Sequence, residues 1–359
     1  MPKLLVSCGT LASGGAERVL SILSKSFADT FDDVIYLTWI DMPDFYPLDD
    51  RVKRVCVERE CGSKNIINKS LWFRKFICSE NVSLILSFLE PFNVLICGCL
   101  MGTKVPIVVA DRNDPRLVWN DTFHGTLRKL FYKRAQGIVC QTEHNRSYYK
   151  GKLLERTYVI FNPIFLPEEY LGKALNQEKQ NKIVSVVRLE PQKNIPMLLR
   201  AFYLFQRSHQ DFKLVIYGEG KLRQELEMLI EKMGMTENVE MPGAMQNVWD
   251  LIINAKCFAL SSWYEGLSNA LMEALCLGLP CVATKVSGAV DFINDGENGL
   301  LVDLDDEKAM SDCFGKMAED TEFAQMLGMN AVNMYSLLQK EVICKQWVDY
   351  LKSFVSENN

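Results

Sequence analysis

The sequence of residues 263–274 is Trp-Tyr-Glu-Gly-Leu-Ser-Asn-Ala-Leu-Met-Glu-Ala, and an apolar run precedes it. This pattern predicts a strand, a short loop and then a helix that begins at Ser268 or Asn269. Open α/β sheets bind ligands at the carboxyl ends of parallel strands, and the first turn of a helix there offers free backbone N–H groups. We therefore expect Glu265, in the loop, and Glu273, on the helix, to face one crevice.

A plainer interpretation of the two glutamates stays open at this point. Glu265 can be a solvated acid in a loop, and Glu273 can be an acid that interacts with the positive end of the helix dipole. For a single pair of this kind, that is the commoner explanation. The rest of the chain has to decide between the two.

Length and charge limit the classes of protein to which the chain can belong. At 359 residues it exceeds what one hydrophobic core usually spans, so we expect two domains. The apolar fraction of 48% is sufficient for both domains to fold. The net charge of −5 argues against a nucleic-acid-binding protein, because Lys and Arg are not in excess.

The cysteines and the most apolar stretch indicate a cytosolic protein. The chain has 12 cysteines but no Cys-x-x-Cys pair, and Cys97-Gly98-Cys99 has no further ligands at metal-binding spacing, so we expect reduced, mostly buried thiols. The N-terminus runs directly into a strand pattern, so no signal peptide is expected. Residues 82–101 are apolar, but Glu90-Pro91 interrupts them, which predicts a strand and a buried helix instead of a membrane span.

Short apolar runs alternate with helical patterns along the chain, as is typical of parallel sheets covered by helices on both faces. Strands are predicted at 4–8, 34–38, 51–57, 83–88, 107–110, 137–141, 183–187, 213–217, 239–241, 257–262, 281–283 and 299–302, and a last helix near 342–354. The alternation stops at a polar tract and then restarts. We therefore expect α/β domains at 1–165 and 183–341, joined by a linker at 166–182, with a ligand cleft between their sheets.

Two cations follow the first predicted strand of the second domain. Arg188 ends that strand and Lys193 lies in the next loop, so both can lie over the same crevice as Glu265. A planar arginine fork and a mobile lysine charge together suit a diphosphate that leaves during a reaction, although two exposed surface cations are the alternative. Gly218-Glu219-Gly220, after the next strand, is either a plain turn or a second approach of the backbone to the same ligand.

Gly14-Gly15 follows the first predicted strand and precedes a helix, so the backbone there can turn tightly and approach a ligand. The pair belongs to neither a Walker A loop nor a Gly-x-Gly-x-x-Gly pattern, and a structural turn is an equal alternative. His124, His144 and His209 form no triad pattern, and we expect His209 to be solvated. The acidic residues at 303–306 predict a helix-capping turn, so no metal site is predicted.

Five short motifs occur in a fixed order over nearly the whole chain. They are Ser13-Gly14-Gly15-Ala16-Glu17-Arg18, Arg188-Leu189 with Lys193-Asn194, Gly218-Glu219-Gly220, Glu265-Gly266-Leu267 with Glu273-Ala274, and Asn298-Gly299-Leu300-Leu301-Val302. This ordered set resembles the family 4 glycosyltransferases of the GT-B fold. Two neighbouring glutamates are common by chance, but the ordered set is not, so the resemblance favours a ligand-binding role for Glu265 and Glu273.

The resemblance implies two Rossmann-like domains that face a central cleft, with the C-terminal helix, about 342–359, crossing back to the N-terminal domain. The N-terminal domain would bind the acceptor, and the C-terminal domain would bind a nucleotide sugar. The implied reaction is transfer of the sugar with retention of configuration, without a metal or other cofactor. The leaving diphosphate would itself take the proton of the acceptor hydroxyl on the same face of the sugar.

The resemblance also implies roles for individual residues. Arg188 and Lys193 would hold the donor diphosphate, Glu265 would accept hydrogen bonds from the donor sugar, and Glu273 would hold the ribose hydroxyls. The remaining donor contacts would be Gly15, Gly218, Glu219, Gly266, Leu267, Ser268 and Asn269. Gly14 would let the first domain approach the acceptor.

The chain departs from many members of the family at two places. Val187 stands where many relatives have a glycine. After the strand at 107–110, where many relatives have a histidine, this chain has Asp111-Arg112-Asn113-Asp114-Pro115, which resembles members acting in bacterial surface-polysaccharide and lipid-linked oligosaccharide assembly. Arg112 and Asn113 are therefore candidates for contact with donor or acceptor, and no histidine base is expected there.

The overall pattern resembles transferases that add N-acetylhexosamine or galactose to an undecaprenyl-diphosphate-linked glycan. We therefore expect a UDP-sugar donor of GalNAc, GlcNAc or Gal, and a cytoplasmic enzyme peripheral to the inner membrane that acts in lipopolysaccharide or capsule synthesis. Two basic stretches fit an anionic lipid carrier, 72–76 and 128–134, and the second supplies the acceptor candidates Arg128, Lys129 and Lys133. An ordinary helix with one core face and one solvated face is the alternative.

Three other functions remain open from the sequence. A transferase of the same fold can use a GDP-sugar such as GDP-mannose. A sugar epimerase binds a UDP-sugar in a similar way but needs no acceptor. A non-catalytic subunit binds without turnover, although the presence of Arg188, Lys193, Glu265 and Glu273 argues against it.

Overall fold

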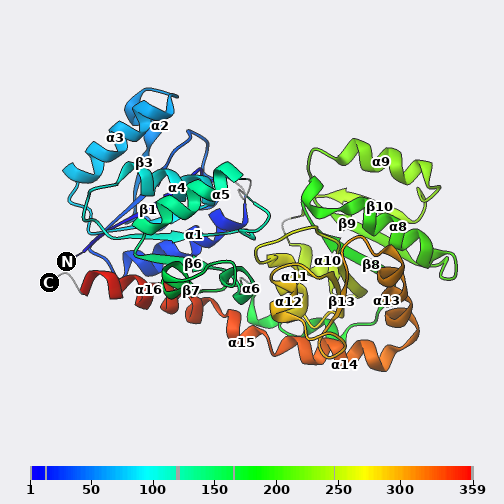
Figure 1. Ribbon diagram of the computed structural model, residues 1–359. Helices are drawn as coiled ribbons and strands as arrows, with labels where there is room; N and C mark the ends of the chain where they lie inside the picture. The colour runs from blue at the N-terminus through cyan, green and yellow to red at the C-terminus, as the bar shows by residue number, and fades with distance from the viewer. Residues whose placement is uncertain (1, 13, 119–121, 165, 246, 357–359) are drawn as a thin grey trace. The chain divides into compact units, whose positions relative to one another are not determined.

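The computed structural model describes residues 2–12, 14–118, 122–164, 166–245 and 247–356. The chain forms two compact units (Figure 1). The first contains Met1–Pro163 and Leu338–Asn359, and the second contains Ile164–Leu337. Each unit is an α/β unit with its own sheet.

Within the described residues, the first unit is built on seven parallel strands in the order β3-β2-β1-β4-β5-β6-β7. The strands are β1 (Lys3–Cys8), β2 (Asp33–Thr38), β3 (Lys53–Cys56), β4 (Leu84–Phe88), β5 (Ile107–Ala110), β6 (Gly137–Cys140) and β7 (Thr157–Val159). Successive side chains of β1 alternate between two cores, with Leu4 and Val6 in one and Leu5 in the other. Both faces of this sheet are therefore buried, as predicted for a parallel sheet.

Helices connect these strands and cover the sheet (Figure 1). They are α1 (Gly15–Ala28), α2 (Val57–Cys61), α3 (Ile66–Ser79), α4 (Glu90–Cys99), α5 (Thr122–Phe131), η1 (Tyr132–Arg134), α6 (Glu143–Arg146), α7 (Lys152–Glu155) and α16 (Lys340–Ser356). The C-terminal helix α16, red in Figure 1, packs against α1 and β4. Its Trp347 is fully buried, 5.6 Å from the ring of Phe88, so the predicted return of this helix to the first unit is confirmed.

Within the described residues, the second unit has six parallel strands in the order β10-β9-β8-β11-β12-β13. The strands are β8 (Gln180–Val186), β9 (Lys213–Tyr217), β10 (Val239–Gly243), β11 (Ala255–Leu260), β12 (Cys281–Thr284) and β13 (Leu300–Val302). The helices are η4 (Pro191–Lys193), α8 (Ile195–Gln206), α9 (Arg223–Lys232), α10 (Val248–Ile252), α11 (Asn269–Cys276), α12 (Ala289–Phe292), α13 (Glu307–Glu319), α14 (Thr321–Val332) and α15 (Tyr335–Leu338). The prediction of two Rossmann-like α/β units is confirmed.

The polar stretch 166–182, which we expected to be a linker, is packed into the second unit. It contains two short 3-10 helices, η2 (Glu168–Tyr170) and η3 (Lys173–Asn176). The backbone N–H groups of Gly172 and Ala174 donate to the carbonyls of Cys276 and Leu277 at the end of α11, at 3.0 and 2.9 Å. These hydrogen bonds fix the stretch, although its composition is that of an exposed connection.

The apolar stretch 82–101 forms β4 and the buried helix α4, as predicted. Among the helices of the described ranges, none combines the length and the apolarity that a membrane crossing requires. All twelve cysteines are free thiols and most are buried, which confirms the interpretation of the cysteine pattern.

Candidate functional site

The candidate site of the second unit lies at the carboxyl ends of β8 and β11. Arg188 follows β8 and is exposed, and its side chain makes no hydrogen bond or ion pair with any described residue. Its neighbours Val187 and Leu189 are buried, so the backbone at Arg188 is anchored while the guanidinium is free. An anchored arginine with a free donor fork is suited to binding a phosphate.

Lys193 and Glu265 form an ion pair. Lys193 ends η4, after β8, and Glu265 lies in the loop after β11. The Lys193 ammonium donates to Oε1 of Glu265, and their side chains are only 11% and 7% exposed. The predicted proximity of these two residues is thus present in the structure.

Two further side chains hold the carboxylate of Glu265. The hydroxyl of Ser262 donates to Oε1 at 2.6 Å, and the amide of Gln192 lies 3.5 Å from Oε2. The Gln192 amide also donates to the carbonyl of Tyr264 at 2.7 Å. Glu265 is therefore a buried, fixed acceptor and not the solvated loop acid of the plainer interpretation.

Backbone contacts join the loops after β8 and β11. The N–H of Trp263 donates to the carbonyl of Gln192 at 2.9 Å, and the hydroxyl of Ser261 donates to the carbonyl of Lys193 at 2.9 Å. Both bonds end on backbone carbonyls of the loop after β8, so they fix the spacing of the two loops independently of the ion pair.

Asn194, at the start of α8, has a left-handed backbone conformation, with φ 45°. Its side-chain amide donates to Oδ1 of Asp305 at 2.8 Å, and the indole N–H of Trp263 donates to the same oxygen at 2.9 Å. Asp305 thus stabilises the turn that carries Lys193. Asp306 accepts from the N–H of Ala309 at 2.8 Å, so the capping role predicted for the acidic residues at 303–306 is confirmed.

Glu273 lies on α11 and is 8% exposed. Its Oε2 accepts a hydrogen bond of 2.9 Å from the indole N–H of Trp249, in α10. Ser268 caps α11 by accepting from the N–H of Leu271 at 3.4 Å, which confirms the predicted start of this helix. Leu267 and Ser268 are themselves nearly buried, while Gly266 and Asn269 complete the turn that enters α11.

Two glycines allow β8 and β9 to end side by side. Gly218 has φ 149°, and a Cβ on it would lie 1.8 Å from the carbonyl oxygen of Val187. A Cβ on Gly220 would lie 2.4 Å from the carbonyl oxygen of Leu189. The glycines therefore let the turn after β9 pack against the backbone on either side of Arg188.

Glu219, between these two glycines, is engaged with a neighbouring arginine. Its carboxylate accepts from Nε of Arg223 at 2.8 Å, and this guanidinium holds the pKa of the Glu219 carboxyl below its usual range. The N–H of Leu189 donates to the Glu219 carbonyl at 2.9 Å. In the structure it is thus the backbone of Glu219, and not its carboxylate, that contacts the loop of Arg188.

Gly288 is a further residue of the site that the sequence did not single out. Its φ is 80°, and a Cβ on it would lie 2.8 Å from the carbonyl oxygen of Gly266 and 3.1 Å from Cα of Leu267. The turn after β12 therefore supports the loop that carries Glu265.

In the first unit, Gly14 and Gly15 form the start of α1, after β1. A Cβ on Gly14 would lie 2.2 Å from Oε2 of Glu17, so the Glu17 carboxylate folds back over this helix end. A carboxylate at the positive end of a helix is favourable. Ser13, the first residue of this motif, lies outside the described residues.

Arg112 follows β5 and is buried. One terminal nitrogen donates to the side chain of Asn162, and the guanidinium lies 4.9 Å from the centre of the Phe88 ring. Its Nε and Nη1 have no partner among the described residues. Burial lowers the pKa of Arg112 to about 10, which reflects how costly it is to keep this charge away from water.

Asn113, the next residue, is fastened to Glu90 at the start of α4. The N–H groups of Arg112 and Asn113 donate to Oε1 of Glu90 at 3.2 and 3.1 Å, and the Asn113 amide lies 3.4 Å from Oε2. Burial and the nearby charge of Asp111 raise the pKa of Glu90 to about 7. Glu90 therefore fixes the loop that carries the Arg-Asn-Asp-Pro motif.

The three candidates in the second basic stretch have different environments. Arg128 is fully buried, and its terminal nitrogens donate to the carbonyls of Pro115 and Val118, both at 2.7 Å. This guanidinium therefore satisfies two carbonyls of the preceding loop, and the acceptor contact of Arg128 stays a prediction. Lys129 and Lys133 are exposed.

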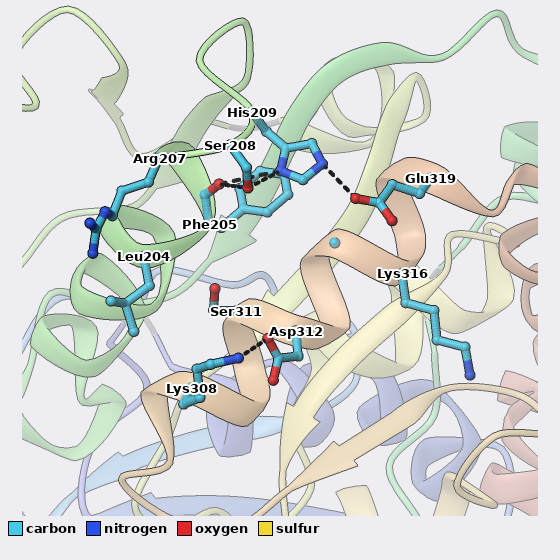
Figure 2. Close-up of a pocket in the computed structure, with 11 residues that line it drawn as sticks. Leu204, Phe205, Arg207, Ser208, His209, Lys308, Ser311, Asp312, Lys316 and Glu319 are labelled. Atoms are coloured by element: carbon cyan, nitrogen blue, oxygen red, sulfur yellow. Dashed lines mark hydrogen bonds and ion pairs between the residues drawn. The ribbon is translucent and has the colours of Figure 1, made fainter.

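Each of the three histidines has neighbours of its own in the described structure. His209 was expected to be solvated, but its side chain is only 17% exposed. Its ring stacks on Phe205, and its Nε2 lies 3.2 Å from Oε1 of Glu319 (Figure 2). His144 lies 3.3 Å from Asp114. His124 lies on α5, against Phe123. Among the described residues, no group of three or more His, Cys, Asp or Glu side chains is arranged to hold a metal ion.

Several residues of the site could not be identified from sequence patterns. Gln192 and Ser262 flank the motifs, and only their positions beside Lys193 and Glu265 point to them. Trp249 lies in a separate helix, and no sequence pattern connects it with Glu273. The pairing of Asn194 with Asp305 spans 111 residues and is equally hidden.

Comparison with known proteins gives a family match within the second unit. Residues 168–334 match the family described as glycosyl transferases group 1. This range includes Arg188, Lys193, Glu265 and Glu273. The pattern of motifs and the match to the family model thus lead to the same assignment.

Two relatives from Campylobacter jejuni align over nearly the whole chain. One is an alpha-1,4-N-acetyl-D-galactosaminyltransferase whose name gives its acceptor as GalNAc-alpha-(1->4)-GalNAc-alpha-(1->3)-diNAcBac-PP-undecaprenol; it is 27% identical over 97% of this chain and 98% of its own. The other is an N-acetylgalactosamine-N,N'-diacetylbacillosaminyl-diphospho-undecaprenol 4-alpha-N-acetylgalactosaminyltransferase, 28% identical over 98% of this chain and 100% of its own.

Solved structures establish the fold. Sucrose-phosphate synthase from Thermosynechococcus elongatus has a TM-score of 0.85 at 16% identity and covers 100% of both chains. Anabaena Alr3699/HepE, solved in complex with UDP and glucose, has a TM-score of 0.79 at 18% identity and covers 98% of this chain and 100% of its own. The fold of the chain is GT-B, as the resemblance implied.

Proposed function

We propose that the chain is a glycosyltransferase that moves a sugar from a UDP-sugar to a lipid-linked or surface-polysaccharide glycan with retention of configuration. Its GT-B fold and the match of residues 168–334 to the glycosyl transferases group 1 family support this proposal. The observation that carries the proposal is the buried Lys193–Glu265 pair beside the free guanidinium of Arg188. These groups place two positive charges and one acceptor at the carboxyl ends of β8 and β11, where α/β units bind ligands.

In the proposed reaction, Arg188 and Lys193 bind the donor diphosphate. The Lys193 ammonium has three donors and gives one to Glu265, so two remain for phosphate oxygens. Both charges stabilise the diphosphate as the bond between its oxygen and the anomeric carbon breaks. The acceptor oxygen forms its bond to the anomeric carbon on the same face, and its proton passes to the leaving diphosphate.

In this proposal, Glu265 binds the donor sugar by accepting hydrogen bonds from its hydroxyls. Ser262, Gln192 and Lys193 occupy part of its carboxylate and fix its orientation. An ionised carboxylate has about four lone-pair sites, so it can still accept from sugar hydroxyls. Backbone N–H groups at the start of α11 supply further donors.

Glu273 holds the ribose hydroxyls of the donor in this proposal. Its Oε2 is oriented by Trp249, and an ionised carboxylate has about four lone-pair sites, so the group can accept from more than one donor. The close turn at Gly218 and Gly220 lets the backbone reach the nucleotide.

The donor is proposed to be UDP-GalNAc, UDP-GlcNAc or UDP-galactose. The two Campylobacter relatives are N-acetylgalactosaminyltransferases, and the HepE structure contains UDP and glucose. A thermal-shift screen of UDP-, GDP- and ADP-sugars tests the choice, because a ligand that binds only the folded state raises its melting temperature. Stabilisation by GDP-mannose alone would favour the GDP-sugar alternative.

The acceptor is proposed to be an undecaprenyl-diphosphate-linked glycan, as the names of both Campylobacter relatives state for those enzymes. In the first unit, the buried Arg112 has two nitrogens without a partner among the described residues, which supports a contact with a bound anion or hydroxyl. The decisive assay supplies a UDP-sugar and a synthetic lipid-linked glycan, and determines the anomeric configuration of the product by NMR. Conversion of the UDP-sugar without an acceptor would instead favour an epimerase, and binding without turnover would favour a non-catalytic subunit.

We also propose that the enzyme works at the cytoplasmic face of the inner membrane. Helix α3 exposes Ile66, Ile67 and Leu71, and Lys75 lies on the same helix. Exposed apolar side chains next to a lysine suit the interface of an anionic membrane. Flotation with anionic liposomes should recover the wild type but not Ile67→Glu/Leu71→Glu, and equal recovery would reject the proposal.

Metal independence is a further part of the proposal, because Arg188 and Lys193 supply the charge that a divalent ion supplies in other transferases. Turnover should therefore persist after treatment with EDTA. Loss of turnover that is restored by added Mg²⁺ or Mn²⁺ would contradict it.

A further inference from the structure

Two surface pockets differ in how their charges are paired. The pocket in Figure 2 lies between α8 and α13, and four of its ionic side chains form two pairs, Lys308 with Asp312 and His209 with Glu319. The second pocket, of about 560 Å³, lies wholly in the first unit. We call it the lysine pocket, and its cations form no ion pair with described residues.

The lysine pocket is lined by Lys129, Lys133, Lys150, Lys152 and Arg156, and by aromatic side chains that include Tyr148. No carboxylate is among the described residues that line it. The four lysine side chains make no hydrogen bond or ion pair with any described residue. Unpaired like charges raise the free energy of the folded state, and a bound multivalent anion lowers it.

The wall of the pocket is rigid where its two arginines lie. Arg128 is fixed by the carbonyls of Pro115 and Val118, with the Tyr148 ring 5.7 Å from its guanidinium. Arg156 gives Nη1 to the carbonyls of Lys133 and Ala135, at 3.3 and 3.0 Å. Its Nε and Nη2 make no hydrogen bond with described residues and remain available to a ligand. The pocket therefore combines hydrogen-bonded arginines with lysines that have no partner among the described residues.

The position of the lysine pocket separates it from the ligand-binding edge of the sheet. Lys133 precedes β6, and Arg156 immediately precedes β7, so both lie at the amino ends of these strands. The ligand edge of an open α/β sheet is at the opposite, carboxyl ends, where Arg112 follows β5. The lysine pocket is thus not part of the edge of the sheet at which a ligand of the first unit is expected to bind.

We propose that the lysine pocket is a second anion site, which binds a phosphate or diphosphate group independently of the donor. Its cations match a group with several negative oxygens, and its volume and tyrosines leave room for an attached organic portion. The phosphate can belong to a soluble compound or to a lipid headgroup. The proposal does not depend on the transfer reaction.

Inorganic pyrophosphate is the probe for the first test, by isothermal titration calorimetry at low ionic strength. All variants carry Arg188→Ala, which removes a proposed diphosphate contact of the donor site. Lys133→Glu/Lys150→Glu should weaken binding about tenfold or more, because each reversed charge near the anion changes its binding free energy substantially. The matched control is Lys232→Glu/Lys345→Glu, which reverses two exposed lysines that do not line the pocket and gives the same net charge.

The control should bind pyrophosphate as tightly as Arg188→Ala alone. Absence of binding to Arg188→Ala, or equal weakening in the pocket variant and the control, would overturn the proposal. Melting temperatures of all variants, measured without ligand, identify a variant that has lost its fold. If the double variant has lost its fold, the single variants Lys133→Ala and Lys150→Ala are measured in its place. Each should weaken pyrophosphate binding, while Lys232→Ala should not.

Vesicles distinguish the two sources of the phosphate. Cosedimentation is measured with phosphatidylglycerol and with phosphatidylcholine vesicles. A loss of phosphatidylglycerol binding in the pocket variant but not in the control supports a lipid headgroup. Unchanged vesicle binding together with specific loss of pyrophosphate binding supports a soluble phosphate.

Discussion

The ammonium group of Lys193 donates a hydrogen bond to Glu265 from a loop that follows a different strand, and both side chains are almost buried. The pair therefore belongs both to the site and to the packing of the second unit. Substitution of Lys193 alone leaves the Glu265 charge buried, and among the described residues only Ser262 and Gln192 remain as side-chain partners.

We predict that Lys193→Ala lowers the free energy of unfolding by about 3 kcal/mol, because a buried charge that loses its partner is strongly destabilising. The double variant Lys193→Met/Glu265→Gln should recover most of that stability, since neither charge remains, but should not recover transfer. Urea unfolding measures both effects. Equal stability of Lys193→Ala and the wild type would show that the pair contributes nothing to the fold.

Arg188 gives the cleaner test of the diphosphate contact, because its exposed side chain has no partner in the described structure. Arg188→Ala should lower kcat/KM about 10²–10³-fold, while the free energy of unfolding changes by less than about 0.5 kcal/mol. Arg207→Ala is the matched control, an exposed and unpartnered arginine of the same unit, on the pocket of Figure 2. Wild-type turnover in Arg188→Ala would refute the proposed role.

Gly218 should be the most sensitive glycine of the site. Gly218→Ala places Cβ 1.8 Å from the Val187 carbonyl oxygen, so the backbone beside Arg188 has to move. We expect a loss of about 2 kcal/mol or more of stability together with weaker donor binding. Gly234→Ala is the control, because Gly234 also has a positive φ, 70°, but open space around it, and it should cost only about 1 kcal/mol. Unfolding curves and donor KM values compare the two.

The sequence predicted most of the fold because the strands are short apolar runs between helical patterns. It also predicted that Lys193 and Glu265 lie close together, since each follows a parallel strand at the same edge of a sheet. The prediction at 51–57 was less accurate: β3 ends at Cys56, and Val57 begins a helix. Val57 is buried in either conformation, so apolarity alone could not distinguish a strand from a helix there.

Side-chain partners that come from distant segments could not be predicted. The basic stretch made Arg128 a candidate for contact with the acceptor, and nothing in it indicated that carbonyls of the loop at 115–118 bind its guanidinium inside the first unit. The indole of Trp249 orients Glu273 from a separate helix. Such pairings depend on the packing of elements in three dimensions, and no local spacing in the sequence encodes them.

Glu90 makes the stability of the first unit depend on pH. Burial, first, and the charge of Asp111 raise the pKa of its carboxyl from 4.5 to about 7. Between these two values the folded protein holds a proton that the unfolded chain has released. The contribution of Glu90 to stability is therefore full below about pH 4.5 and is lost as the pH rises to about 7.

The variant Glu90→Gln tests this dependence, because an amide keeps the oxygen that accepts from the N–H groups of Arg112 and Asn113 but cannot titrate. The free energy of unfolding, measured between pH 4.5 and 7, should decrease less steeply with pH in Glu90→Gln than in the wild type. Glu155→Gln, at an exposed carboxylate of the same unit, should follow the wild-type curve. If Glu90→Gln instead gave the wild-type slope, the proton would reside on another group, and Glu90 would act only as a fixed carboxylate that fastens the loop of Arg112.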